Sequence, residues 1–165
     1  MNRWALYEIK KTDSNMKKMF FALLCMGLAF TSMAQLKNPV KWTYTAKKIA
    51  PNTYEVHITA AIDRGWHVYS LDHKGETGVA TSVKFNANPL ATANGKPAAT
   101  SKPVKMKDPS SGEIAKFYEN TLDIVQVFKL KASVKTNITG EVEYMTCDDT
   151  QCLPPTTKSF SVSLQ

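Results

Sequence analysis

Two cysteines five positions apart, Cys147 and Cys152, are the residues whose type and spacing point most directly to chemistry. They lie between two strand-like runs, Glu141–Met145 and Ser159–Leu164, so we expect one loop at the rim of a sheet to carry both sulfurs. In an oxidising compartment such a pair can form a disulfide. A disulfide that closes so short a loop adds only about 2 kcal/mol to stability, so the domain should stay folded when it is reduced.

Three kinds of site fit this loop. A redox-active pair needs one sulfur that a thiolate can reach, and an edge loop can provide it. A structural disulfide fits the spacing at least as well, since most disulfides of exported proteins are structural. Zinc is the third option, but no His or further Cys lies nearby at ligand spacing, and we expect neither a metal nor a cofactor. Asp148 and Asp149 should raise a thiol pKa, and Pro154-Pro155 should stiffen the chain, which favours exchange with a dedicated partner.

The N-terminal region is typical of a secretory signal peptide. A basic start, Met16-Lys17-Lys18, precedes the apolar run Met19–Phe30, which is too short to span a bilayer as a helix, and small residues follow up to Ala34. We therefore expect cleavage after Ala34 and a domain of residues 35–165 that is periplasmic or secreted. A buried core helix or a membrane anchor is the alternative for the apolar run. Translation could begin at Met1 or at Met16.

Much of the positive charge belongs to this leader. Removing residues 1–34 lowers the formal net charge from +7 to +4, because five of the 21 basic residues and two of the 14 acidic residues lie there. The remaining excess is weak evidence for nucleic acid, and we expect no nucleic-acid partner. Loss of Cys25 also leaves an even pair of cysteines, which suits an oxidising compartment.

Beyond the leader, apolar residues recur at every second position, which is typical of half-buried strands. The clearest run is Tyr54, Val56, Ile58, Ala60 and Ile62. Shorter or less regular runs occupy residues 42–44, 83–85, 122–130, 142–144 and 160–164. About seven strands without an amphipathic helix predict an all-β fold, an antiparallel β-sandwich that forms one domain.

Turn residues interrupt these runs. Pro51-Asn52, Asp63-Arg64-Gly65, Asn94-Gly95 and Thr139-Gly140 are all predicted turns. One longer segment, Asn86–Ala115, has several prolines and glycines and few large apolar residues. A connection of this length is usually functional or a mobile surface excursion, and both interpretations remain open.

Three segments resemble a known family. The run Val142–Val162 (VEYMTCDDTQCLPPTTKSFSV) resembles the signature of the N-terminal periplasmic domain of DsbD, the thiol:disulfide interchange protein. That signature is a strand that ends in an aromatic residue, then Cys, acidic residues, a second Cys, Pro-Pro and a final strand. Gly65–Tyr69 (GWHVY) and Lys116–Asn120 (KFYEN) are similar to two further family segments. The likeness covers most of residues 36–165 and implies an immunoglobulin-like sandwich.

The resemblance also implies roles for individual residues. Cys147 and Cys152 would be the redox pair of an exported thiol:disulfide interchange domain, with Cys152 forming the mixed disulfide and Cys147 resolving it. His67 and Tyr69 match positions where aromatic side chains pack around the sulfurs, and Trp66 could belong to the same cluster. Ordinary core or rim packing is the alternative for these three. His67 could also titrate near neutral pH and influence a thiolate.

The family's cap over the disulfide corresponds to Lys107–Gly112, where Asp108 matches its acidic residue loosely and no aromatic tip is present. The implied electron donor is a thioredoxin-like domain or a membrane electron-transfer protein, and the implied acceptors are exported disulfide-containing proteins. DsbD continues into membrane helices and a thioredoxin-like domain, so we expect these partners to be separate proteins. The alternative function is a non-catalytic β-sandwich binding module with a structural disulfide.

The leader gives a direct prediction about processing. The exported protein should begin at Gln35, because the basic, apolar and small-residue regions end together at Ala34. N-terminal sequencing of the exported protein measures this. A protein that keeps Met19–Phe30 and is found in the membrane fraction would contradict cleavage.

Overall fold

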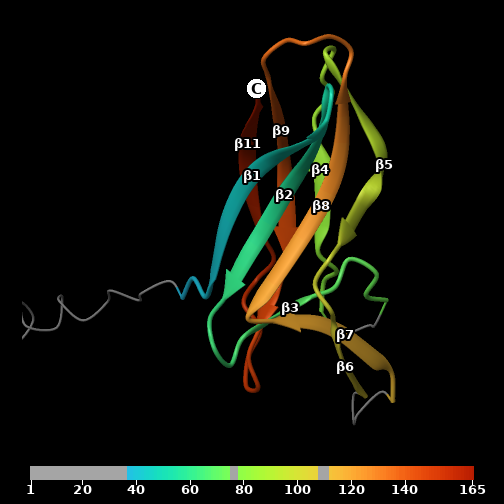
Figure 1. The fold of residues 1–165 in the computed structure, drawn as a ribbon. Coiled ribbons are helices and arrows are strands. Elements are labelled where there is room, and N and C mark those ends of the chain that lie inside the picture. Colours follow the sequence, from blue (N-terminus) through green and yellow to red (C-terminus); the bar gives the residue numbers. More distant parts are fainter. Residues whose placement is uncertain (1–36, 75–77, 108–111) are drawn as a thin grey trace, which may run out of the picture. The chain divides into compact units, whose positions relative to one another are not determined.

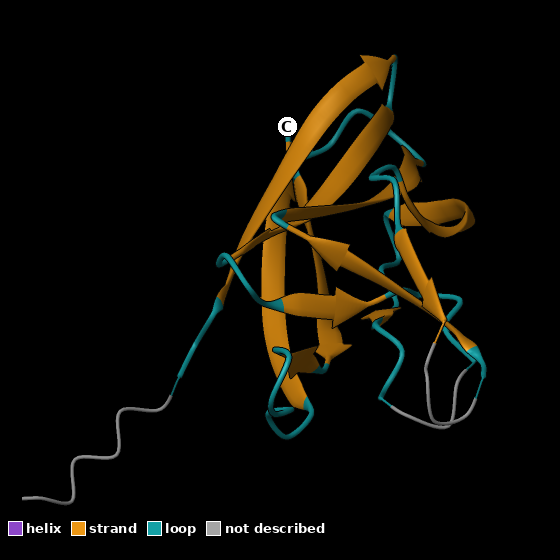
Figure 2. Ribbon diagram, turned by 90° about the horizontal axis from the view of Figure 1, so that it is seen from below, coloured by secondary structure: helices purple, strands orange, loops and turns teal. Residues whose placement is uncertain are grey.

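The computed structural model describes residues 37–74, 78–107 and 112–165, so the leader expected at residues 1–34 lies outside the described residues. All the regular elements it describes are strands, and Figure 2 shows these strands joined by loops. The described ranges contain no helical segment with the length and apolar character that a membrane span requires. In chain order the strands are β1 (Val40–Ala50), β2 (Thr53–Ile62), β3 (His67–Tyr69), β4 (Ser82–Phe85), β5 (Ala91–Ala99), β6 (Val104–Lys107), β7 (Ile114–Glu119), β8 (Thr121–Leu130), β9 (Thr136–Tyr144), β10 (Thr146–Cys147) and β11 (Thr156–Leu164).

These strands form three antiparallel sheets. Sheet A has the order β1-β2-β8-β5, sheet B the order β10-β3-β7-β6, and sheet C the order β11-β9-β4. In Figure 1 the long strands of sheet A lie in front of β9 and β11, and the short strands of sheet B lie below them. Face-to-face packing of sheets A and C gives the predicted all-β, immunoglobulin-like antiparallel sandwich. The expectation of about seven strands was too low, because β3 and β10 are too short to show a period and the mostly exposed β5 and β6 do not alternate.

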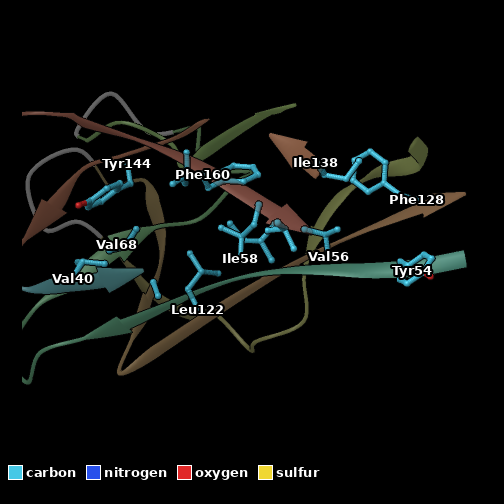
Figure 3. Close-up of a cluster of buried hydrophobic side chains, with 14 of the residues drawn as sticks. Val40, Tyr54, Val56, Ile58, Val68, Leu122, Phe128, Ile138, Tyr144 and Phe160 are labelled. Atoms are coloured by element: carbon cyan, nitrogen blue, oxygen red, sulfur yellow. The ribbon is translucent and has the colours of Figure 1, made fainter. Parts of the chain in front are cut away.

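The core lies between sheets A and C. The five alternating apolar residues of β2, from Tyr54 to Ile62, are all buried, as the period of two predicts. Figure 3 shows Val56, Ile58 and Leu122 of sheet A gathered with Ile138 and Phe160 of sheet C. Three aromatic ring pairs join the two sheets: Trp42–Tyr144, Tyr44–Phe160 and Phe85–Phe128. A fourth pair, Phe85–Phe160, lies within sheet C. This core positions sheet B without using either cysteine.

Three connections join sheet A to sheet B, from β2 to β3, from β5 to β6 and from β7 to β8. The chain passes from β7 to β8 at Asn120, whose φ of 61° lies in the left-handed region that asparagine tolerates. It passes from β5 to β6 through Thr100, whose hydroxyl donates to the Asp123 carboxylate at 3.0 Å. The same carboxylate accepts hydrogen bonds from Thr59 at 2.8 Å and pairs with His57 at 3.0 Å. Burial alone would raise the pKa of Asp123, but these three hydrogen bonds hold it below its ordinary value.

The segment Asn86–Ala115 is largely strand, which corrects the prediction of a long irregular connection. It contains β5 and β6, whose side chains are mostly exposed because both strands lie at sheet edges. Asn94-Gly95 is also no turn between strands but part of a bulge in β5, where the register with β8 shifts between Asn94 and Ala98. The buried Gln126 side chain faces this bulge and donates to the Asn94 carbonyl at 2.9 Å. An edge strand without alternation gives no periodic signal, and the prediction failed for that reason.

Two of the four predicted turns are confirmed. Asn52, with φ of 56°, joins β1 to β2, and Gly65, with φ of 81°, lies before β3. Thr139-Gly140 was wrong, because both residues lie inside β9. A Cβ atom at Gly140 would lie 2.3 Å from the Lys84 carbonyl oxygen and 2.7 Å from Cζ of Phe160. This glycine therefore marks a close approach of three strands rather than a turn.

Replacing Gly140 with alanine should destabilise the sandwich. The added methyl group has no room beside the β4 backbone and the Phe160 ring, and overpacking of this kind costs about 1–3 kcal/mol. Urea unfolding measures the loss. Ser161→Ala is the matched control, since Ser161 is exposed on the neighbouring strand β11 and should change the unfolding free energy by no more than about 0.5 kcal/mol. Equal stabilities for the two variants would contradict the close packing.

Candidate functional site

The candidate site is a short hairpin at one edge of sheet B. Cys147 ends β10, and a disulfide joins it to Cys152 across a Cα–Cα distance of 4.0 Å. The two cysteines also form an isolated antiparallel bridge, and the Leu153 N–H donates to the Thr146 carbonyl at 2.9 Å. Only 2% of Cys147 is exposed, whereas Cys152 is exposed. An approaching thiolate can therefore reach one sulfur much more easily than the other.

Asp148 holds the turn of this hairpin. Its Oδ1 accepts hydrogen bonds from the Thr150 N–H, the Thr150 hydroxyl and the Gln151 N–H, each at 2.8 Å. These bonds, the Thr150 N–H foremost, hold the pKa of Asp148 at about 2. Asp149 is exposed next to it and has no such structural role in the turn. The two aspartates, which are adjacent in sequence, therefore differ in structural role.

Tyr69 lies beside the buried sulfur. Its hydroxyl is 4.0 Å from Sγ of Cys147, and only 8% of the residue is exposed. The ring packs on His73 at a centroid distance of 4.4 Å, and a Cβ at Gly78 would come within 2.2 Å of it. The buried Thr81 hydroxyl donates to the Tyr69 carbonyl at 2.6 Å. Tyr69 is therefore fixed from several sides and presents its hydroxyl to the disulfide.

His67 lies on the same face of the sheet. It is the direct partner of Cys147 in the ladder between β3 and β10, and opposite residues in such a ladder point to the same side. The imidazole packs on Phe117 at 4.5 Å and against Tyr69 at 5.6 Å between ring centroids. Burial lowers the His67 pKa, and Glu119, Asp149 and Asp148 oppose that shift without reversing it. The imidazole is therefore mostly neutral at neutral pH.

The structure thus brings together most of the predicted residues. Cys147, Cys152, His67, Tyr69, Asp148 and Asp149 form one cluster, and Asp108 lies outside the described residues. Trp66 packs against the main hydrophobic core instead. Sequence reasoning assigned no role to Glu119 or His73. Glu119 follows the aromatic pair Phe117-Tyr118 at a strand end, and this pattern could have pointed to a site residue. No local sequence pattern marks His73 as a site residue.

The chemistry open to this cluster is thiol–disulfide exchange at a sulfur on the protein surface. Within the described ranges, no three His, Cys, Asp or Glu side chains form a group that could hold a metal ion. The structure is thus a β-sandwich domain with a disulfide at one sheet edge, of which one cysteine is buried and the other is exposed.

The amino-acid sequence matches the family described as thiol:disulfide interchange protein DsbD, N-terminal, over residues 34–164. The chain belongs to this family, in agreement with the resemblance found in the sequence. No curated protein matches it.

Solved structures with a similar fold include the reduced N-terminal domain of DsbD from Neisseria meningitidis, with 19% identity, a TM-score of 0.45 and coverage of 74% of this chain and 84% of that one. The complex between the DsbD and PilB N-terminal domains of the same organism has 17% identity and a TM-score of 0.48, with coverage of 78% of this chain and 87% of that one. The N-terminal periplasmic domain of ScsB from Proteus mirabilis has 16% identity and a TM-score of 0.47, with coverage of 78% of this chain and 49% of that one.

The turn should respond to acid through Asp148. A carboxylate whose pKa is depressed in the folded state keeps its contribution above its unfolded pKa and loses it as the pH falls toward the folded value. The Thr150 and Gln151 amide signals should therefore shift with a midpoint at about pH 2 in an NMR titration. Asp148→Asn should abolish this titration and is the control. Amide shifts in the wild type with a midpoint near 4, the ordinary aspartate value, would contradict the assignment.

Proposed function

We propose that this domain works outside the cytoplasm as a thiol:disulfide interchange module. It would carry electrons from a thioredoxin-like or membrane donor to exported disulfide-containing proteins. The observation that carries the proposal is the unequal burial of the pair, with Cys147 2% exposed and Cys152 on the surface. A purely structural bridge has no need of this asymmetry. A shuttle needs it, because one sulfur must meet partners while the other waits nearby.

The proposed exchange proceeds in two steps. A donor thiolate attacks Sγ of Cys152, forms a mixed disulfide and releases the Cys147 thiolate, which takes up a proton. The second donor thiol, as thiolate, then attacks the donor sulfur of the mixed disulfide, closes the donor's own disulfide and releases the Cys152 thiolate, which is protonated in turn. Two electrons and two protons have then moved to the domain. The same steps in reverse reduce an acceptor disulfide.

The surroundings of the pair favour partner-dependent exchange. Asp148 and Asp149 place two negative charges beside the accessible sulfur and repel small anionic thiolates. A protein partner can compensate this charge with its own surface, whereas a small thiol cannot. We place the module in the periplasm or among secreted proteins, with cleavage after Ala34, because of the leader pattern.

Trapping experiments test the roles of the two sulfurs. The donor for this test is a thioredoxin-like protein whose second cysteine is replaced by serine and whose attacking cysteine carries an aromatic thiol as a mixed disulfide. Cys147→Ser should accumulate a covalent adduct with it, because Cys152 displaces the aromatic thiolate and neither protein then has a thiol that can resolve the new bond. Cys152→Ser is the matched control and should form little adduct, because its remaining thiol is buried. Non-reducing electrophoresis with mass spectrometry measures the adducts.

Two outcomes oppose the proposal. Adducts with Cys152→Ser alone would reverse the roles of the cysteines. The absence of adducts with both variants, with global unfolding on reduction by circular dichroism, would instead favour a binding module with a structural disulfide.

A further inference from the structure

Three side chains from three adjacent strands lie in one row across sheet B. His67 of β3 is paired with Cys147 of β10 on one side and with Glu119 of β7 on the other. Opposite residues of antiparallel strands point to the same face, with Cβ atoms about 4.5–5.5 Å apart. The row is therefore a thiol, an imidazole and a carboxylate in sequence. This order is that of a nucleophile, its base and the group that orients the base.

Cys147 needs a proton acceptor, and this row contains one. To close the disulfide, Cys147 must lose its proton, but a residue that is 2% exposed has little access to water as a base. A buried thiolate is also costly unless a neighbouring group stabilises it. The Tyr69 hydroxyl, 4.0 Å away, can donate to the sulfur but takes up no proton near neutral pH. The imidazole of His67 is the neighbouring group that can accept a proton near neutral pH.

We propose that His67 accepts the proton of Cys147 when this thiol resolves the mixed disulfide, and that Glu119 stabilises the imidazolium that results. The inference rests on the proposed function and concerns the reduction of an acceptor, in which Cys147 closes the domain's own disulfide. Proton transfer to the imidazole leaves a Cys147 thiolate, which attacks Sγ of Cys152. The Cys147–Cys152 bond forms, the bond between Cys152 and the partner breaks, and the partner leaves as a thiolate. The imidazolium then gives its proton to water or to the departing thiolate.

The charges around the imidazole support this role. Burial keeps His67 neutral and so able to accept a proton. Three carboxylates face it, Glu119 from β7 and Asp148 and Asp149 from the hairpin, and each favours the charged imidazolium. From β3 itself the facing group is Tyr69, and from β7 the uncharged Phe117 ring packs on the imidazole. The environment therefore favours a neutral resting state and still stabilises the charged product.

The reaction of the reduced protein with a chromogenic aromatic disulfide separates the two steps. Attack by Cys152 releases one coloured thiolate, and resolution by Cys147 releases a second. The pH dependence of the second phase is the measurement. His67→Phe keeps a ring against Phe117 and Tyr69 but has no proton acceptor, so its second phase at pH 7 should be slower by about tenfold or more, with an unchanged first phase. Glu119→Gln should move the midpoint of the second phase to lower pH.

His57→Gln is the matched control, because His57 pairs with Asp123 in sheet A and should leave both phases unchanged. If it alters the second phase as His67→Phe does, the assignment to His67 is wrong. A second phase of folded His67→Phe that matches the wild type at every pH overturns the inference and leaves the proposed function standing. Loss of the first phase in the wild type would oppose the proposed function itself. Should His67→Phe fail to fold, Glu119→Gln decides, and an unchanged midpoint overturns the inference.

Discussion

The two-residue ladder between β3 and β10 is the constraint on which the candidate site depends. It pairs Thr146 with Val68 and Cys147 with His67. Both residues of this short strand are buried, and the two pairs decide which of them lies beside the imidazole. They bury Cys147, align it with the imidazole and leave the return strand, with Cys152, at the surface. A slip of one residue would move the sulfur to the opposite face.

The rest of the fold keeps this ladder in place. β3 pairs with β7, and β7 continues through Asn120 into β8, a central strand of sheet A. Asp123 of β8 fixes the connection from β5 to β6 by its contacts with Thr100. Sheet B is therefore attached to the sandwich at these two connections and also at Met145, where β9 leads into β10.

Most of the long strands were predictable from the sequence, and the reasons are visible in β2 and β11, which bury one face and leave the other half-buried or exposed. The local hairpin was also predictable, because both cysteines and the charged turn are close in sequence. The bulge in β5 was not predictable. In the sequence its partner Gln126 interrupts the apolar period, and nothing indicates that this side chain is a buried hydrogen-bond donor. The row through Glu119 depends on the registers of two ladders, which no local pattern specifies.

Cys147, Tyr69 and Phe117 are buried, yet they stand apart from the main cluster of core side chains. The protein thus has a large interior that sets its stability and a small separate one that surrounds its disulfide. Substitutions around the hairpin can change how readily the bond accepts electrons with little effect on unfolding, and changes in the large core can do the reverse. Durability and reactivity are in this sense two independent traits, so that selection, or an engineer, can alter one while the other is conserved.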